Sequence, residues 1–453
     1  MIRKKRNGGL GQIVRISVTS GIFGQIFSTL CGSGSAFLTK FAIMLNAAPI
    51  HFAILAAIGQ ISQIFQPIGA LVTKGRTKRK SVVLTLEFIA YCIAFCFGLL
   101  PFIFSEKNAM FAFLLLFFLS ISLLSVANNA WIGWITGIVP LKVRGRFFSV
   151  LSQYVMLTAV LVGIGFSLFI DFFSASARQD IAKESSAFFK PENLPLGFIT
   201  IFSVAILAAF SRLLKLSRLP EREKKIEEDT LPRMFSLPLR DSNFRKFLLF
   251  NCWWMFAVGI GAPFWQPFML QKLGMTLFEV QIYSGVNIAA AILVLRVWGR
   301  IIDGYGNRTA MRLIIMLGGF NPMVWLFVTP HNYYILYMEA VTSGIMWAGA
   351  GLVATNFVLS IAPDEKRQLY SGVSGAFSGL AMVITMLASG VFLPESPAIR
   401  EIHLEPEQVL FGLTAIARWT AQIPLSLVQE RKSRPVSEAI AFFVREVKPK
   451  IMK

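Results

Sequence analysis

The sequence predicts an all-α membrane protein of about twelve transmembrane helices, arranged as two pseudo-symmetric six-helix bundles. Apolar residues make up 55% of the 453 positions and charged residues only 15%, whereas a soluble domain carries roughly 25% charge. The apolar residues come in stretches long enough to cross the hydrocarbon layer, which takes a helix of about 20 residues. One long polar connector divides these stretches into two sets of six. A bilayer is therefore the expected solvent of the chain.

The apolar segments are separated by charged or turn-rich breaks. They fall at 18–45, 50–72, 81–104, 109–138, 147–171, 195–216, 246–270, 277–302, 310–329, 333–361, 369–393 and 407–429. The long connector between the sixth and the seventh contains the run EREKKIEEDT. We therefore divide the chain into an N-terminal bundle (1–217), a cytoplasmic connector (218–245), a C-terminal bundle (246–430) and a basic cytoplasmic tail (431–453).

The formal net charge of +20 would suit a nucleic-acid binder. Whether it indicates nucleic-acid binding or membrane topology depends on where the basic residues lie in the chain. Most of the 44 Lys and Arg residues, Arg212 among them, fall on one side of the predicted topology. This asymmetry satisfies the positive-inside rule. It predicts a multi-pass protein of the plasma (inner) membrane with both termini in the cytoplasm. The basic residues then lie against anionic lipid headgroups, and we expect no nucleic-acid partner.

Metal, redox and enzymatic functions find little support in the sequence. The four cysteines fall in apolar segments without C-x-x-C spacing or Cys/His clustering, so we expect no metal and no cofactor. There is no phosphate-binding loop for an ATP-driven pump. The three histidines fall in or beside outer loops, where catalysis on a cytoplasmic substrate is implausible. We therefore expect that the protein is not an enzyme.

A tight turn with the sequence GRIIDGYGNR follows the eighth apolar segment. Gly299 permits close approach of helices, Asp303 places one charge at a helix end, and Gly306 allows the backbone to reverse quickly. A degenerate copy with the sequence GALVTKGRTK stands 230 residues earlier, where Thr73 takes the acidic position. The two turns indicate an internal repeat.

A second pair of turns follows the fourth and tenth segments, and each places Arg four residues after Pro. They are Pro140 to Arg144 and Pro363 to Arg367. Together the four turns, in register with twelve spans, resemble those of the major facilitator superfamily. The resemblance implies that the conformational loop residues are Gly299, Asp303, Gly306, Arg308, Gly69, Arg144 and Arg367. It also implies that Asp303 holds neighbouring helix ends together in one transport state; the alternative is that the turns only fix topology.

In the same superfamily the first, fourth, seventh and tenth spans line a central cavity. The first span carries residues at steps of three and four that share one helical face: Gln25, Ser28, Gly32, Ser35 and Thr39. The fourth span offers Asn128 and Asn129. The alternative for the first span is a packing face of small residues, and for the fourth it is hydrogen bonding between helices.

The seventh and tenth spans add aromatic rings, amides and one acid. The candidates are Trp254, Trp265, Gln266, Glu339, Ser343, Trp347 and Asn356. Rings together with amides suit a ring-bearing or amphipathic solute. For Trp254 a position in the interfacial aromatic belt is the alternative.

Four charged residues fall well within spans: Lys40, Glu87, Glu339 and Arg418. A charge at the bilayer centre costs at least about 2.5 kcal/mol, so such residues usually pair or face water. We expect that Glu339 either couples protons or holds Arg418 until solute displaces it, and a purely structural pair is the alternative. For Glu87, support of the first helix is the alternative to a coupling role.

The resemblance implies a secondary active transporter, a symporter or an antiporter, that moves a small solute by alternating access. The fifth span lacks the Gly-Pro-Gly run of the superfamily's drug antiporters and the first span lacks an acid. This favours a metabolite over the alternative of multidrug efflux. A non-transporting receptor or assembly protein is the third reading. We expect a monomer whose partners are a small-molecule solute, membrane lipids and protons.

Overall fold

The computed structural model describes residues 2–66, 79–173, 189–221, 237–363, 366–394, 398–399, 402–430 and 433–442. The degenerate loop copy at 69–78, with Gly69, lies outside these residues. Within them, ten helices are long and apolar enough to cross a membrane, and Pro49–Ile64 is a shorter apolar helix. The chain folds into two compact units, Met1–Glu228 with Thr276–Gln281, and Asp229–Met275 with Ile282–Lys453. The expected all-helical membrane fold is confirmed.

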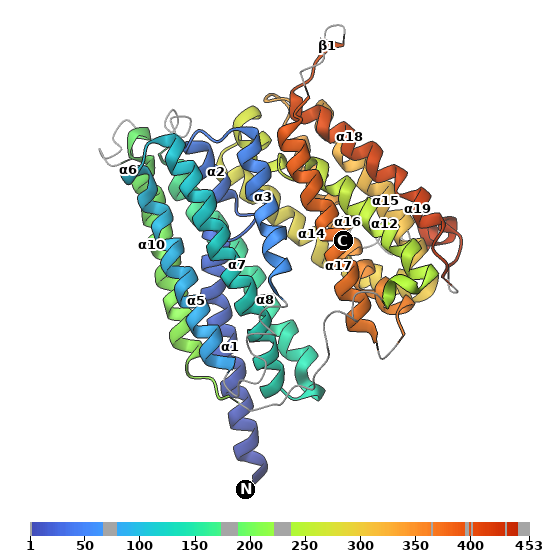
Figure 1. Ribbon diagram of the computed structural model, residues 1–453, viewed down its shortest axis with the longest axis horizontal. Coiled ribbons are helices and arrows are strands. Elements are labelled where there is room, and N and C mark those ends of the chain that lie inside the picture. Colours follow the sequence, from blue (N-terminus) through green and yellow to red (C-terminus); the bar gives the residue numbers. More distant parts are fainter. Residues whose placement is uncertain are drawn as a thin grey trace, which may run out of the picture. The chain divides into compact units, whose positions relative to one another are not determined.

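The first unit is a helix bundle, drawn from blue to green in Figure 1. Its elements are α1 (Ile2–Cys31), α2 (Ala36–Met44), α3 (Pro49–Ile64), α5 (Arg79–Phe95), η1 (Cys96–Leu99), α6 (Leu100–Ile103), α7 (Glu106–Ile138), α8 (Leu141–Asp171), η3 (Pro191–Asn193) and α10 (Leu194–Leu216). They cover the six spans expected in the N-terminal half.

The second unit is also helical and carries one two-stranded hairpin. Its elements are η4 (Pro238–Arg240), α12 (Ser242–Gly261), α13 (Trp265–Pro267), η5 (Phe268–Lys272), α14 (Leu277–Tyr305), α15 (Asn307–Val324), η6 (Trp325–Phe327), α16 (Ile335–Ile361), α17 (Arg367–Val391), β1 (Ala398–Ile399), β2 (Ile402–His403), α18 (Pro406–Thr420) and α19 (Gln422–Ser426). The twelfth expected segment is thus divided into α18 and α19. The first residues of α14 are grouped with the first unit.

The same helix pairings occur in both units. In the first unit α1 packs against α8 and α10, and α5 packs against α7 and α10. In the second unit α12 packs against α17 and α18, and α15 packs against α16 and α18. These are corresponding spans of the two halves, so the internal repeat indicated by the turns is also a repeat of packing.

A carboxylate that follows the sixth span of each unit caps the helix of the third span. Glu221 Oε1 accepts the backbone N–H of Lys80, at the start of α5, at 2.7 Å. Glu430 accepts the backbone N–H groups of Asn307 and Arg308, at the start of α15, at 2.9 and 2.7 Å. The first N–H groups of a helix lack partners within it, and negative charge is favourable there. The two carboxylates therefore fix equivalent helix ends.

The first span is interrupted between α1 and α2. Gly34 has a φ of +78°, in the left-handed region that glycine adopts without strain. The Ser35 side chain accepts the backbone N–H of Phe37 at 3.2 Å, which caps α2, and donates to the Thr29 carbonyl at 2.6 Å. The single helix expected for this span is therefore wrong, because local hydrogen bonds stabilise a break at Gly32–Ser35.

Aromatic packing holds α2 in place beyond the break. The ring of Phe41 meets those of Phe113, Phe198 and Phe202 edge-on, each at a centroid distance of 5.2 Å. Edge-to-face geometry is favourable for such rings. Phe41 is fully buried, so α2 is anchored to α7 and α10 although it is short.

Candidate functional site

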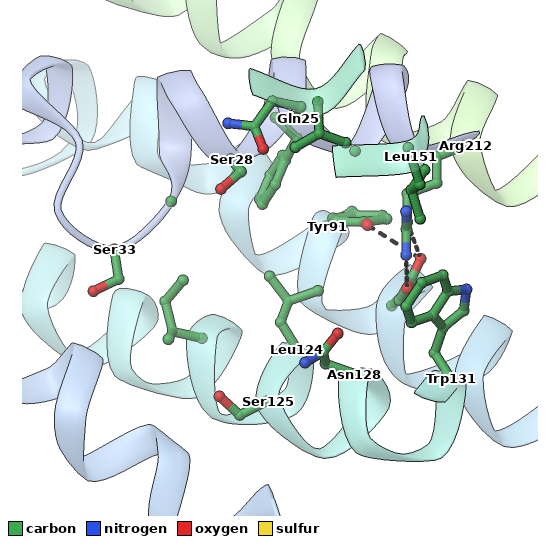
Figure 2. Close-up of a pocket in the computed structure, with 17 residues that line it drawn as sticks. Gln25, Ser28, Ser33, Tyr91, Leu124, Ser125, Asn128, Trp131, Leu151 and Arg212 are labelled. Carbon is green, nitrogen blue, oxygen red and sulfur yellow. Dashed lines mark hydrogen bonds and ion pairs between the residues drawn. The ribbon is translucent and has the colours of Figure 1, made fainter. Parts of the chain in front are cut away.

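A cavity of about 350 Å³ lies within the first unit (Figure 2). It is lined from α1, α5, α7, α8 and α10 and from the break after α1. Its apolar walls include Phe27, Ile121, Leu124, Leu151 and Val155, and its polar groups are Gln25, Ser28, Ser33, Ser125, Asn128, Glu87, Tyr91 and Arg212. Small-molecule sites have this character, apolar walls with a few placed polar groups in a volume of roughly 300–1,000 Å³.

Neutral polar side chains face the cavity from two helices. Gln25 and Ser28 are three residues apart on α1, and Ser125 and Asn128 are three residues apart on α7. This spacing puts each pair on one helical face. Figure 2 shows the α1 pair on one side of the cavity and the α7 pair on the other.

The cavity receives only part of the face expected on the first span. Gln25, Ser28 and Gly32 line it. Ser35 and Thr39 are buried and do not line it. The break after α1 causes the difference, because it takes the residues of α2 off the face of α1.

In the fourth span Asn128 lines the cavity, whereas its neighbour Asn129 does not. Two serines that line the cavity were not among the candidates named from the sequence. Ser125 lies three residues before Asn128, and that spacing could have revealed it. Ser33 reaches the cavity through the helix break, for which its glycine neighbours are the only local signal.

A buried ion pair forms one end of the cavity. Arg212 Nη2 lies 2.9 Å from Glu87 Oε1, and Arg212 Nε donates to Glu87 Oε2 at 3.0 Å. Tyr91 donates its hydroxyl to Oε2 at 3.1 Å, and Arg212 Nη1 donates to the Ser20 carbonyl at 3.3 Å. The Glu87 residue is only 3% exposed. This two-pronged contact is the strongest geometry that a guanidinium and a carboxylate can form.

The sequence places Arg212 among the basic residues that set topology and does not predict its pairing with Glu87. The side chain lies inside the first unit, and a Cβ added at Gly24 would sit 2.8 Å from its Nη1, so the glycine makes room for it. The Arg212 Cζ atom lies 5.9 Å from the ring centre of Trp131, in cation–π range. The pairing could have been predicted from Glu87, because a carboxylate within a membrane span needs a nearby cation.

Lys40 lies elsewhere in the first unit. It is half-buried and within range of Coulomb attraction to Asp171, at the end of α8. The Asp171 carboxylate accepts the backbone N–H groups of Leu277 and Phe278, at 3.0 and 2.7 Å. These two residues belong to the same unit, so Lys40 and Asp171 stand beside the start of α14.

In the second unit, Arg418 is 3% exposed and donates from Nη1 to the Gly318 carbonyl at 3.0 Å. That carbonyl has no donor within its own helix, because Pro322, four residues further along α15, has no N–H group. The indole rings of Trp254 and Trp347 lie 5.8 and 5.7 Å from Arg418 Cζ. The guanidinium is thus held by a proline-freed carbonyl and two aromatic rings.

Glu339 has a different partner from the one expected. Tyr283 donates its hydroxyl to Glu339 Oε2 at 2.7 Å, and Ser343 lies close by. Among the described residues Glu339 makes no ion pair within 4.0 Å, although it attracts Arg418 at longer range. A coupling role for Glu339 stays a prediction.

The remaining candidates of the second unit are dispersed. The Trp265 ring stacks on Phe411 with a centroid distance of 3.9 Å and an angle of 8° between the planes. Gln266 beside it is half-buried. Asn356 is exposed, about 20 Å along α16 from Ser343 at a rise of about 1.5 Å per residue.

The turn between α14 and α15 reverses at Gly306, where φ is +91°. Asp303 is exposed and makes no hydrogen bond or ion pair to any residue that the structure describes. A Cβ at Gly299 would meet no atom within 4 Å, so this part of the structure shows no close helix approach there. The carboxylate that orders the turn is that of Glu430, and the role expected of Asp303 stays a prediction.

Two arginines of these turns, Arg308 and Arg144, donate to carbonyl groups. Arg308 Nη2 donates to the Ser426 carbonyl at 2.7 Å. Arg144 Nη2 donates to the Thr136 carbonyl at 2.6 Å, at the end of α7. Arg367 is the first residue of α17. Basic side chains at helix ends of this kind satisfy carbonyls that have no intrahelical partner.

Comparison with known proteins gives one family and many structures. The model of the Major Facilitator Superfamily matches residues 21–386. The structure is similar to the nucleoside transporter NupG (TM-score 0.65, 12% identity, 94% of this chain and 99% of that one). It is also similar to the inward-open xylose transporter XylE from E. coli (TM-score 0.64, 13% identity, 95% of this chain and 98% of that one). A third similar structure is a bacterial homologue of the iron transporter ferroportin (TM-score 0.66, 14% identity, 92% of this chain and 97% of that one). A search of proteins with curated functions finds no match to the chain.

We expect that replacing either member of the buried ion pair costs more than replacing both. Glu87→Gln or Arg212→Gln leaves one buried charge without its partner, which costs about 3–5 kcal/mol. The double variant should recover more than half of that loss. Unfolding of the purified protein in mixed detergent micelles measures it.

The control is Glu405→Gln, which breaks the Lys272–Glu405 pair, whose side chains are 39% and 46% exposed. It should cost less than about 1 kcal/mol. Additive losses in the Glu87 and Arg212 variants would contradict the assignment of a coupled pair.

Arg418 should be coupled energetically to Pro322. Arg418→Met leaves the Gly318 carbonyl without a donor, at a cost of about 1–3 kcal/mol. Pro322→Ala returns an N–H to that carbonyl, so in this background the same substitution should cost about 1 kcal/mol less. A double-mutant cycle of unfolding measures the difference, and equal costs in both backgrounds would show that the carbonyl does not depend on Arg418.

Proposed function

The chain belongs to the Major Facilitator Superfamily, and we propose that it is a secondary active transporter that moves a small solute across the membrane by alternating access. The observation that carries the proposal is the cavity of about 350 Å³ in the first unit. Polar side chains within membrane-spanning helices are costly and usually serve a solute path or an internal partner. In this cavity several have no internal partner, which supports a solute-binding role.

A metabolite is favoured over a drug. Multidrug sites are broad apolar surfaces, whereas neutral amides and hydroxyls from α1, α7 and the helix break line this cavity. Small, placed polar groups give orientation and specificity to a defined solute. A multidrug antiporter and a non-transporting receptor are the alternatives that the transport experiment has to exclude.

Glu339 is the proposed coupling residue. It is 4% exposed in a membrane-spanning helix, and the Tyr283 hydroxyl donates a hydrogen bond to its carboxyl at 2.7 Å. A carboxyl in such a place can exist with or without its proton, and Tyr283 can donate to either form. Its attraction to Arg418 links the charge of Glu339 to the second buried cation of the fold.

The proposal predicts uptake by the purified protein in proteoliposomes. Solutes that raise its thermal stability are first selected, because a ligand of the folded state alone stabilises it. Radiolabelled solute should then accumulate when a pH gradient is imposed. Glu339→Gln should abolish this accumulation but spare exchange of solute across the membrane.

Tyr283→Phe is the matched variant, since it removes one hydroxyl and keeps the carboxyl. It should retain accumulation. If Glu339→Gln still accumulates solute with an unchanged pH profile, Glu339 is not the coupling site. If a solute binds but neither exchange nor accumulation occurs in the unaltered protein, a receptor replaces the transporter.

A further inference from the structure

Several polar side chains of the first-unit cavity have no hydrogen-bond partner inside the protein. Some other hydroxyls of the same helices do bond to backbone carbonyls, as Ser120 does to Ala90 at 3.0 Å. Four cavity side chains make no hydrogen bond to any described residue: Ser28, Ser33, Ser125 and Asn128. Polar groups left free in a membrane-spanning bundle are available to a ligand.

Gln25 offers a further acceptor. It donates its amide N–H to Thr29 Oγ1 at 3.1 Å, which leaves its carbonyl oxygen as an acceptor. The four free side chains supply the donors, because each serine hydroxyl and the Asn128 amide can donate. The cavity therefore presents both donors and acceptors, all of them neutral.

The charged groups of the cavity, in contrast, are already used. Arg212 donates from Nε and Nη2 to Glu87 and from Nη1 to the Ser20 carbonyl. Both oxygens of Glu87 accept from Arg212, and one also accepts from Tyr91. Neither charge is free to bind an ion of opposite sign, and together they cancel.

We infer that this cavity takes a neutral, polar solute that carries several hydroxyl, amide or carbonyl groups on a compact frame. The inference deepens the proposed function and rests on it, because it takes the cavity to be where solute binds. The apolar walls, such as Phe27 and Leu124, suit the C–H faces of such a frame.

Charge selection follows from desolvation. An ionised solute gives up strong hydration when it enters, and it regains that energy only from a free group of opposite charge. The cavity has none to offer among its described lining residues. A neutral solute exchanges hydrogen bonds with water for hydrogen bonds with free hydroxyls and amides, so the polar part of its transfer free energy is close to zero. Burial of its apolar C–H surface then makes the transfer favourable.

The test uses pairs of solutes that differ mainly in one charged group: xylose and xylonate, uridine and uridine monophosphate, N-acetylglucosamine and glucosamine. Binding to the purified full-length protein is measured by thermal shift and titration calorimetry. At least one neutral member should bind, and its charged counterpart should bind at least tenfold more weakly.

Ser125→Ala and Asn128→Ala should each weaken binding of the neutral solute by roughly twofold to tenfold, the effect of one neutral hydrogen bond. Ser122→Ala is the matched control. It lies on the same helix, one turn from Ser125, but does not line the cavity, and its hydroxyl makes no hydrogen bond in the described structure. The Ser122→Ala variant should bind the neutral solute with unchanged affinity.

The outcomes separate the inference from the proposed function. Equal or tighter binding of the charged members, or loss of binding in Arg418→Met but not in Asn128→Ala, overturns the neutral-solute inference and leaves transport intact. Binding of no neutral member also overturns it. If no solute of any charge binds or is taken up, the proposed function itself fails.

Discussion

The ion pair between Glu87 and Arg212 is the interaction on which the first unit depends. Three helices meet at it, because Glu87 and Tyr91 come from α5, Arg212 from α10 and the Ser20 carbonyl from α1. Gly24 leaves the space that the guanidinium fills. Two charges that would each be costly in a bilayer become one neutral, directional contact. That contact closes one end of the cavity and leaves only uncharged groups for a solute.

The second unit handles its buried cation in another way. Pro322 removes one N–H from α15, and Arg418 supplies the missing donor to Gly318. Trp254 packs against Gly318 and lies over the guanidinium, so the proline, the glycine and the ring form one arrangement. The two units therefore share helix pairings and capping carboxylates, but they use buried arginine differently.

The sequence predicts the fold well because hydrophobic length, basic asymmetry and repeated turns are all local or additive signals. Gln25, Ser28 and Asn128 could be named as candidates because the resemblance to the superfamily selects the first and fourth spans, and helical spacing puts Gln25 and Ser28 on one face. The break at Gly32–Ser35 was missed, since a glycine-rich stretch in a membrane helix also suits close packing. Arg212 was missed because a basic residue near the end of a span satisfies the topology rule, and only the packing of α5 on α10 shows its partner.

The central claim, that the cavity is electrically neutral, can be measured before any solute is known. Asn128→Cys, with the native cysteines replaced, is treated with methanethiosulfonate reagents that carry either a sulfonate or a trimethylammonium group. Each rate is divided by that at an exposed reference, His331→Cys. The account predicts that the two normalised rates agree within about threefold, because Glu87 cancels Arg212. A preference of about tenfold or more for either reagent would mean that one charge of the pair faces the cavity uncompensated, and would contradict the account.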